Sequence, residues 1–151
     1  MGFFVVLASL VLAAALPAKT APIAGLHYLV GRWNCTYRAG AVHLAYTATY
    51  AYDGGGILRE SASWTGGGDE EFLAYDARRG GWTAVVFDGQ GTATILRAPG
   101  SNPNRIAYRS VYPDAGIAVT FDRVSATKYT LHATVRSGGK TITSVDTCLR
   151  H

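Results

Sequence analysis

No complete catalytic motif occurs in the 151 residues of this chain. Its four histidines are isolated, without the His-x-His or His-Glu-x-x-His spacing that binds a metal ion. No serine stands in a Gly-x-Ser-x-Gly elbow, and no glycine run has the Gly-Lys-Ser/Thr ending of a phosphate-binding loop. Basic residues are scattered and only Arg78 and Arg79 are adjacent, so the net charge of +4 indicates no nucleic-acid footprint. The sequence therefore predicts no catalytic residues, no metal ligands and no cofactor.

Charge is also missing from the amino terminus. Residues 1–18 carry no charged side chain, and Phe3–Leu16 is apolar apart from one serine. This run is shorter than the roughly 20 residues that a membrane-spanning helix needs, and the small residues Ala13–Ala15 and Ala18 are typical of a signal cleavage zone. We expect residues 1–18 to be a signal peptide and 22–151 to form one exported domain, periplasmic or secreted, with no stable membrane insertion. An uncleaved anchor and a buried helix are the alternatives.

Helical periodicity is almost absent after the signal, apart from a short helical turn expected at Pro22–Val30. Val42–Tyr52 alternates in the period of a half-buried strand, and turns such as Asp53–Gly56 separate about ten segments of this kind. The first begins at Gly31, and the others span 42–52, 57–64, 70–76, 82–88, 92–98, 105–112, 117–124, 128–137 and 141–149. Short loops require antiparallel neighbours, and closure removes exposed edges. We predict an all-β, antiparallel up-and-down barrel, with a sandwich as the alternative.

Cysteine is scarce, and its two positions are informative. Cys35 lies in the first expected strand and Cys148 in the last. An even pair in an exported chain is most simply a disulfide, and closure of a barrel makes the first and last strands neighbours. Without histidines at finger-like spacing, the pair does not form a zinc site. We expect Cys35 and Cys148 to be bonded.

A family resemblance begins at Gly31-Arg32-Trp33, because Gly-x-Trp at the first strand resembles the signature of lipocalin and calycin barrels. The segments Leu29–Thr36, Asp53–Gly56 and Asp146–Cys148, with Tyr75-Asp76 before a Gly-Trp, are similar to a family of small exported bacterial lipocalin-like barrels of unknown function. The resemblance implies a fold and a compartment. In the lipocalin signature the Trp packs under an Arg from a late strand, for which Arg150 is the closest candidate.

More distantly, the chain is similar to nitrobindin-type haem barrels, whose proximal ligand is a histidine near the carboxyl end. Only His132 and His151 stand there, and neither lies in a matching motif. His132 shares the polar face of its strand with Thr130 and Thr134, so we expect it to point to solvent.

Aromatic residues are the candidate ligand-binding positions. Tyrosine and tryptophan suit cavities that hold apolar or aromatic ligands, and a barrel of this many strands is too wide for side chains to fill completely. The alternative is that they fill the core and stack across strands. The predicted ligand-binding residues are Tyr46, Tyr50, Trp64, Phe72, Trp82, Tyr108 and Tyr129.

The only acidic cluster is Asp69–Glu71. Alternation sends Glu70 and Glu71 to opposite faces, so they do not form a catalytic pair with each other, and we expect the cluster to be solvated at a turn edge.

The prediction for function is an exported barrel that binds a small apolar or amphipathic molecule in its interior. Three alternatives remain open. They are a cavity enzyme of isomerase or hydrolase type that uses a tyrosine and a carboxylate, a haem-binding barrel, and an envelope scaffold without a ligand.

Overall fold

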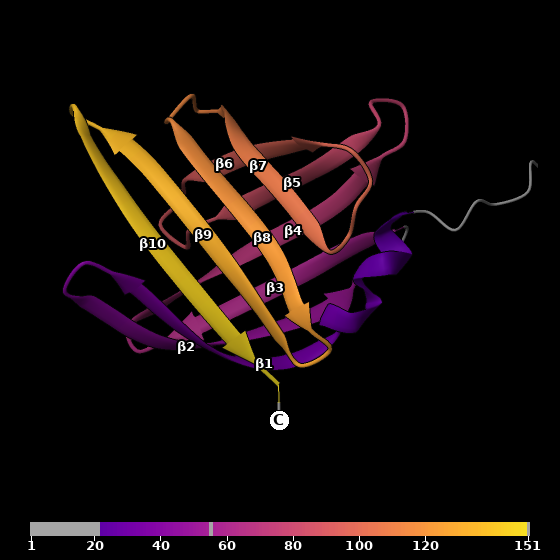
Figure 1. The fold of residues 1–151 in the computed structure, drawn as a ribbon, viewed down its shortest axis with the longest axis horizontal. Coiled ribbons are helices and arrows are strands. Elements are labelled where there is room, and N and C mark those ends of the chain that lie inside the picture. The colour runs from indigo at the N-terminus through magenta and orange to yellow at the C-terminus, as the bar shows by residue number, and fades with distance from the viewer. Residues whose placement is uncertain (1–21, 55, 151) are drawn as a thin grey trace, which may run out of the picture.

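Ten antiparallel strands form a closed barrel in the computed structural model, which describes residues 22–54 and 56–150 (Figure 1). Each strand pairs with its sequence neighbours, and β1 pairs with β10. The predicted all-β, up-and-down barrel is therefore confirmed, whereas the expected signal peptide at residues 1–18 lies outside the described residues. The elements are η1 (Pro22–Leu29), β1 (Gly31–Ala39), β2 (Val42–Tyr52), β3 (Ile57–Trp64), β4 (Gly67–Asp76), β5 (Gly81–Phe87), β6 (Ala93–Pro99), β7 (Arg105–Tyr112), β8 (Ile117–Ser125), β9 (Lys128–Ser137) and β10 (Lys140–Leu149).

The short helical turn expected near the amino terminus is the 3-10 helix η1, which covers one end of the barrel (Figure 1). Its buried side chains, Ile23, Leu26 and Leu29, join the barrel core. Within the described part of the chain, no helix has both the length and the apolar character needed to cross a membrane.

The start of β4 differs most from the sequence prediction, which began this strand at Glu70. Gly67 and Gly68 were expected in a turn, but β4 starts at Gly67, which pairs with Trp64 of β3. A Cβ atom at Gly67 would lie 2.9 Å from Nε1 of Trp64, so glycine allows the indole to cover the strand at this point. The earlier start extends the strand alternation toward the turn, and this places Asp69 and Glu71 on the interior face.

The floor of the barrel depends on the Gly-x-Trp segment. Trp33 is fully buried, and its Nε1 donates a hydrogen bond to the carbonyl oxygen of Leu29 at 2.7 Å. The Arg150 guanidinium lies 4.4 Å from the Trp33 ring centroid and donates to the carbonyl oxygens of Leu29 and Val30 at 3.0 and 2.6 Å. Gly31 has a φ of 117°, a conformation that L side chains rarely adopt. Arg150 thus occupies the place of the late arginine in the lipocalin signature.

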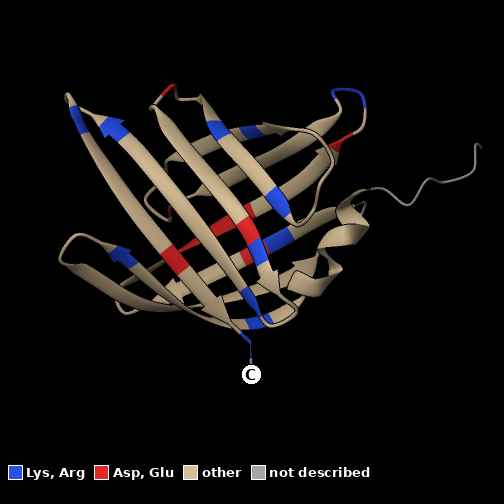
Figure 2. Ribbon diagram, in the orientation of Figure 1, with Lys and Arg blue, Asp and Glu red and all other residues tan. Residues whose placement is uncertain are grey.

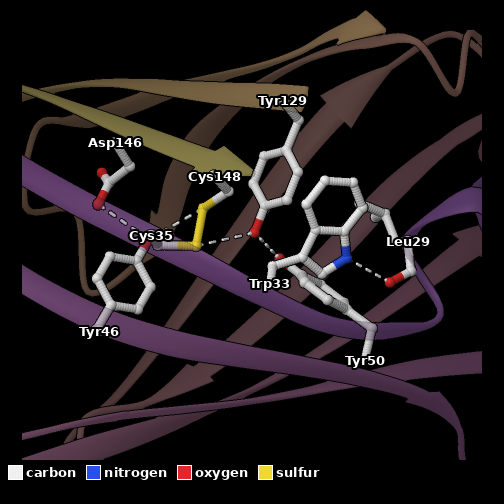
Figure 3. Close-up of a disulfide and its surroundings, with 8 residues drawn as sticks. All are labelled: Leu29, Trp33, Cys35, Tyr46, Tyr50, Tyr129, Asp146 and Cys148. Atoms are coloured by element: carbon white, nitrogen blue, oxygen red, sulfur yellow. Dashed lines mark hydrogen bonds between the residues drawn. A yellow bond between two sulfur atoms is a disulfide. The ribbon is translucent and has the colours of Figure 1, made fainter. Parts of the chain in front are cut away.

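The seam between β1 and β10 is covalently joined. Cys35 and Cys148 are direct partners in the register of the two strands, with Cα atoms 4.1 Å apart, and they form a disulfide (Figure 3). Both side chains are buried within the hydrophobic core. The bridge fastens the first strand of the barrel to the last.

The bridge should contribute strongly to stability, because it links residues separated by 113 positions. The double variant Cys35→Ala/Cys148→Ala should have a free energy of unfolding lower by about 3–4 kcal/mol than the oxidised protein, since loop-closure entropy favours a long cross-link. Urea titration of both proteins measures the difference. Thiol counting on denatured, non-reduced protein is the control, and two free thiols per chain would contradict the bridge.

Candidate functional site

A cavity of about 390 Å³ lies inside the barrel, above the floor. This volume is within the range of about 300–1,000 Å³ that small-molecule pockets usually have. Leu29, at the end of η1, contributes to the bottom of the cavity. The strand residues that line it are Tyr37, Leu44, Tyr46, Tyr50, Glu60, Ala62, Trp64, Asp69, Glu71, Leu73, Val86, Leu96, Tyr108, Val119, Phe121, Leu131, Ala133, Ser144 and Asp146.

Two carboxyl groups face each other in the wall. Glu60 of β3 and Glu71 of β4 are partners in register, and Glu60 is only 6% exposed. Burial raises the pKa of Glu60 well above its usual range, and the charge of Glu71 adds to this rise. Burial raises the pKa of Glu71 to about 7, opposed by its hydrogen bond with Glu60. Burial thus favours the protonated form in both members of this pair, and the two carboxyls titrate together.

A second pair joins β2 to β10 beside the disulfide. The Tyr46 hydroxyl donates to Oδ1 of Asp146 at 3.0 Å and lies 3.8 Å from Sγ of Cys148 (Figure 3). Burial raises the pKa of Asp146 to about 6, although the hydrogen bond from Tyr46 opposes this shift. Burial also raises the pKa of Asp69, with the charges of Glu70 and Asp88 adding to the rise.

The lower part of the cavity is connected to the floor through tyrosines. The hydroxyl oxygens of Tyr50 and Tyr129 are 3.0 Å apart, and the Tyr129 ring packs against Trp33 with centroids 4.9 Å apart (Figure 3). The Tyr129 ring also stacks on Phe121, with centroids 5.0 Å apart. Tyr108 differs from this pair. It is 4% exposed and lines the cavity, yet its buried hydroxyl has no hydrogen-bond partner among the described residues.

The structure brings together only part of the predicted aromatic set. Tyr46, Tyr50, Trp64 and Tyr108 line the cavity, whereas Tyr129 lies below it in the floor. Trp82 is buried but lies outside the lining, where it packs against Tyr75 with ring centroids 5.2 Å apart.

Phe72 is the clear departure from the prediction. Its neighbours Glu71 and Leu73 line the cavity, so alternation places Phe72 on the outer face of β4. There its ring lies 6.1 Å from that of Phe87, and the guanidinium of Arg59 lies 5.9 Å from its centroid. The side chain covers the outside of the sheet and does not line this cavity, contrary to the expectation for Phe72.

Sequence reasoning missed the acidic residues of the cavity. Asp69 and Glu71 were expected at a solvated turn edge, which is wrong because β4 already begins at Gly67. Glu60 carried a usable signal, since it shares the interior face of β3 with Leu58 and Ala62. A charged residue in phase with buried apolar neighbours indicates an interior site.

Histidines do not contribute to this cavity. His132 is exposed on the outer face of β9, as the alternation predicted, and none of the lining residues is a histidine. Across residues 22–54 and 56–150, no three His, Cys, Asp or Glu side chains gather in a group that could hold a metal ion.

Comparison with known proteins identifies the fold but no family. No family model matches the sequence, and no curated protein matches it. The solved structure of the S-type phycobiliprotein lyase CPES from Guillardia theta has a TM-score of 0.56 and 12% identity, covering 88% of this chain and 94% of that one. A chain named EF1p2_mFAP2b, solved bound to DFHBI, has a TM-score of 0.44 and 14% identity, covering 86% and 98%. At 12% identity the first likeness shows the lipocalin-like barrel fold alone.

The raised carboxyl pKa values predict that stability falls as the pH rises from about 5 to 7. Between the ordinary glutamate pKa of 4.5 and the folded-state value of about 7, folded Glu71 holds a proton that the unfolded chain has released. Each such group lowers the free energy of unfolding by up to about 1.4 kcal/mol per pH unit in this window. Urea titrations at several pH values measure the slope, and Glu71→Gln should reduce it.

The adjacent variant Glu70→Gln is the matched control. Glu70 is paired with Arg59 on the outer face, and the pKa of Glu70 is lowered, so its linkage acts below pH 4.5. The slope above pH 5 should therefore persist in Glu70→Gln. Equal slopes in the Glu71 variant and the unmodified protein would contradict the assignment.

Proposed function

We propose that this chain is an exported barrel, with residues 1–18 as its signal peptide, which binds a small amphipathic molecule in its interior. The observation that carries the proposal is the cavity of about 390 Å³, which combines apolar side chains with carboxyl and hydroxyl groups. Pockets for small molecules have this composition, because apolar surface supplies affinity and a few polar groups fix the orientation of the ligand. The disulfide across the seam supports export, since such bonds persist in oxidising compartments.

An enzyme is the second candidate, and the Glu60–Glu71 pair favours it. Two adjacent carboxyls whose pKa values are raised by burial, that of Glu71 to about 7, can donate and accept protons near neutral pH. The fold does not decide the question, since a barrel can carry either activity. Native mass spectrometry of protein incubated with a metabolite extract separates the two, because a carrier retains its ligand unchanged and an enzyme consumes it.

The neutral apolar dye N-phenyl-1-naphthylamine should bind with micromolar affinity, which corresponds to about −8 kcal/mol. Trp64→Ala should weaken this binding by about five- to tenfold, because Trp64 lines the cavity and its indole would contact the dye. Fluorescence titration measures both constants.

Phe72→Ala is the matched control, since it removes an aromatic ring from the outer face of the same barrel and should leave the dye affinity unchanged. No binding at tens of micromolar dye would remove the ligand-binding proposal and leave the scaffold alternative. Equal losses in the two variants would show that the dye does not enter the cavity.

A further inference from the structure

The cavity has two chemically different walls. Strands β10, β1, β2, β3 and β4 are consecutive neighbours around the barrel and supply all the carboxyl groups of the lining. Strands β5 to β9 form the rest of the barrel and contribute no charged side chain to the lining. Their lining residues include Val86, Leu96, Val119, Phe121 and Leu131. A molecule inside would therefore contact acidic groups on one side and apolar groups on the other.

The acidic wall has no basic partner. None of its lining residues is a lysine, arginine or histidine, although Lys and Arg outnumber Asp and Glu by 14 to 10 in the sequence. Figure 2 shows acidic positions within the strands of the barrel as well as near turns. The ion pairs of the described residues involve other acids: Glu70 with Arg59, Asp76 with Arg79, and Asp122 with Arg105. Glu60, Asp69, Glu71 and Asp146 are thus held in the interior without a counter-charge.

Interior carboxyl groups without a partner reduce stability, because desolvation disfavours the ionised form. The barrel interior contains four such carboxyl groups, those of Glu60, Asp69, Glu71 and Asp146, and burial is the main cause of the raised pKa of each. A cation bound among them would restore the ionised form and recover the missing interaction. A ligand is therefore the simplest partner for this wall.

A second feature points to the same ligand. Tyr108 reaches the cavity from β7, opposite the acidic wall, and its buried hydroxyl has no partner. Glu71 lies near enough for its charge to act on this tyrosine. A hydroxyl can accept a hydrogen bond from an N–H group. Tyr50, Trp64 and Tyr108 also make the lining aromatic, and a cation is attracted to the face of an aromatic ring.

We propose that the ligand is an amphipathic organic cation, with a protonated amine or similar group held by Glu71, Glu60 and Tyr108 and an apolar body against β6, β8 and β9. This inference rests on the proposed function and names its ligand class. The cation is organic because the described residues hold no group of side chains suited to a metal ion, whereas the opposite wall suits a hydrocarbon or aromatic body.

Three probes with one aromatic body test the charge directly. Isothermal titration calorimetry at pH 8 compares 1-naphthylmethylamine, a cation, with 1-naphthylmethanol, which is neutral, and 1-naphthoate, an anion. The amine should bind about ten- to a hundredfold more tightly than the alcohol, as hydrogen bonds to charged groups do, and the anion should bind most weakly. Equal binding of amine and alcohol, or tightest binding of the anion, would overturn the cation proposal while leaving the ligand-binding function intact.

Substitutions test which carboxyl group binds the amine. Glu71→Gln should reduce the affinity for the amine about tenfold or more and leave that for the alcohol unchanged, which shows that the cavity is still formed. Glu70→Gln, one residue away on the outer face, should change neither. Loss of alcohol binding together with amine binding in Glu71→Gln, or an equal effect of Glu70→Gln, would overturn the role of Glu71. If neither these probes nor the neutral dye binds, the proposed function fails as well.

The pH dependence of amine binding tests the role of Glu71 without any substitution. Affinity for the amine should increase as the pH rises from 6 to 8, because Glu71 ionises with a pKa of about 7 while an aliphatic amine stays protonated. Affinity for the alcohol should stay constant. The titratable groups that share the cavity with Glu71 or lie near it are Tyr37 of β1, Tyr46 and Tyr50 of β2, Glu60 of β3, Asp69 of β4, Tyr108 of β7, Tyr129 of β9 and Asp146 of β10. A flat profile for the amine would contradict the proposal.

Discussion

The pairing of β1 with β10 is the constraint on which the rest of the structure depends. The Cys35–Cys148 bridge and the Trp33–Arg150 contact both act at or beside this seam. Closure gives the sheet an inside and an outside, and the register across the seam aligns Tyr46 of β2 with Cys148 of β10 through Cys35 of β1. From this position the Tyr46 hydroxyl reaches Asp146, two residues before Cys148. Without the pairing of β1 with β10, the acidic wall would be the face of an open sheet, where water would solvate its carboxyl groups.

Closure explains the chemistry of the interior as well. The floor is filled by Trp33, Tyr129 and the end of η1, so the empty volume lies above it and is bordered by strand residues. Burial there raises the pKa of Glu71 to about 7, and no basic residue of the lining opposes this rise. The same acid on the outer face would pair with arginine, as Glu70 does with Arg59. Glu70 and Glu71 are adjacent in β4, yet Glu70 forms a surface ion pair and Glu71 lines the cavity.

The sequence was sufficient for the architecture because its signals are local. Alternation and glycine turns locate the strands within a few residues, and two cysteines at the ends of the series indicate which strands meet. The site was harder to predict, since it depends on where each strand begins and which face turns inward. Phe72 was predicted to bind the ligand but lies on the outer face, and the cluster Asp69–Glu71 was expected at a solvated turn edge, whereas Asp69 and Glu71 line the cavity. Hydrophobicity alone does not identify the face that lines a cavity, because a cavity can be polar.

The ligand proposed for the acidic interior of this barrel is a small organic cation. The most direct test is native mass spectrometry of protein purified from its own host, followed by release and identification of any bound molecule. We expect a species heavier than the bare chain, which releases a compound with a basic nitrogen and an apolar body. Release of an anionic or wholly apolar compound, or recovery of the bare chain alone with no affinity for amines, would contradict it.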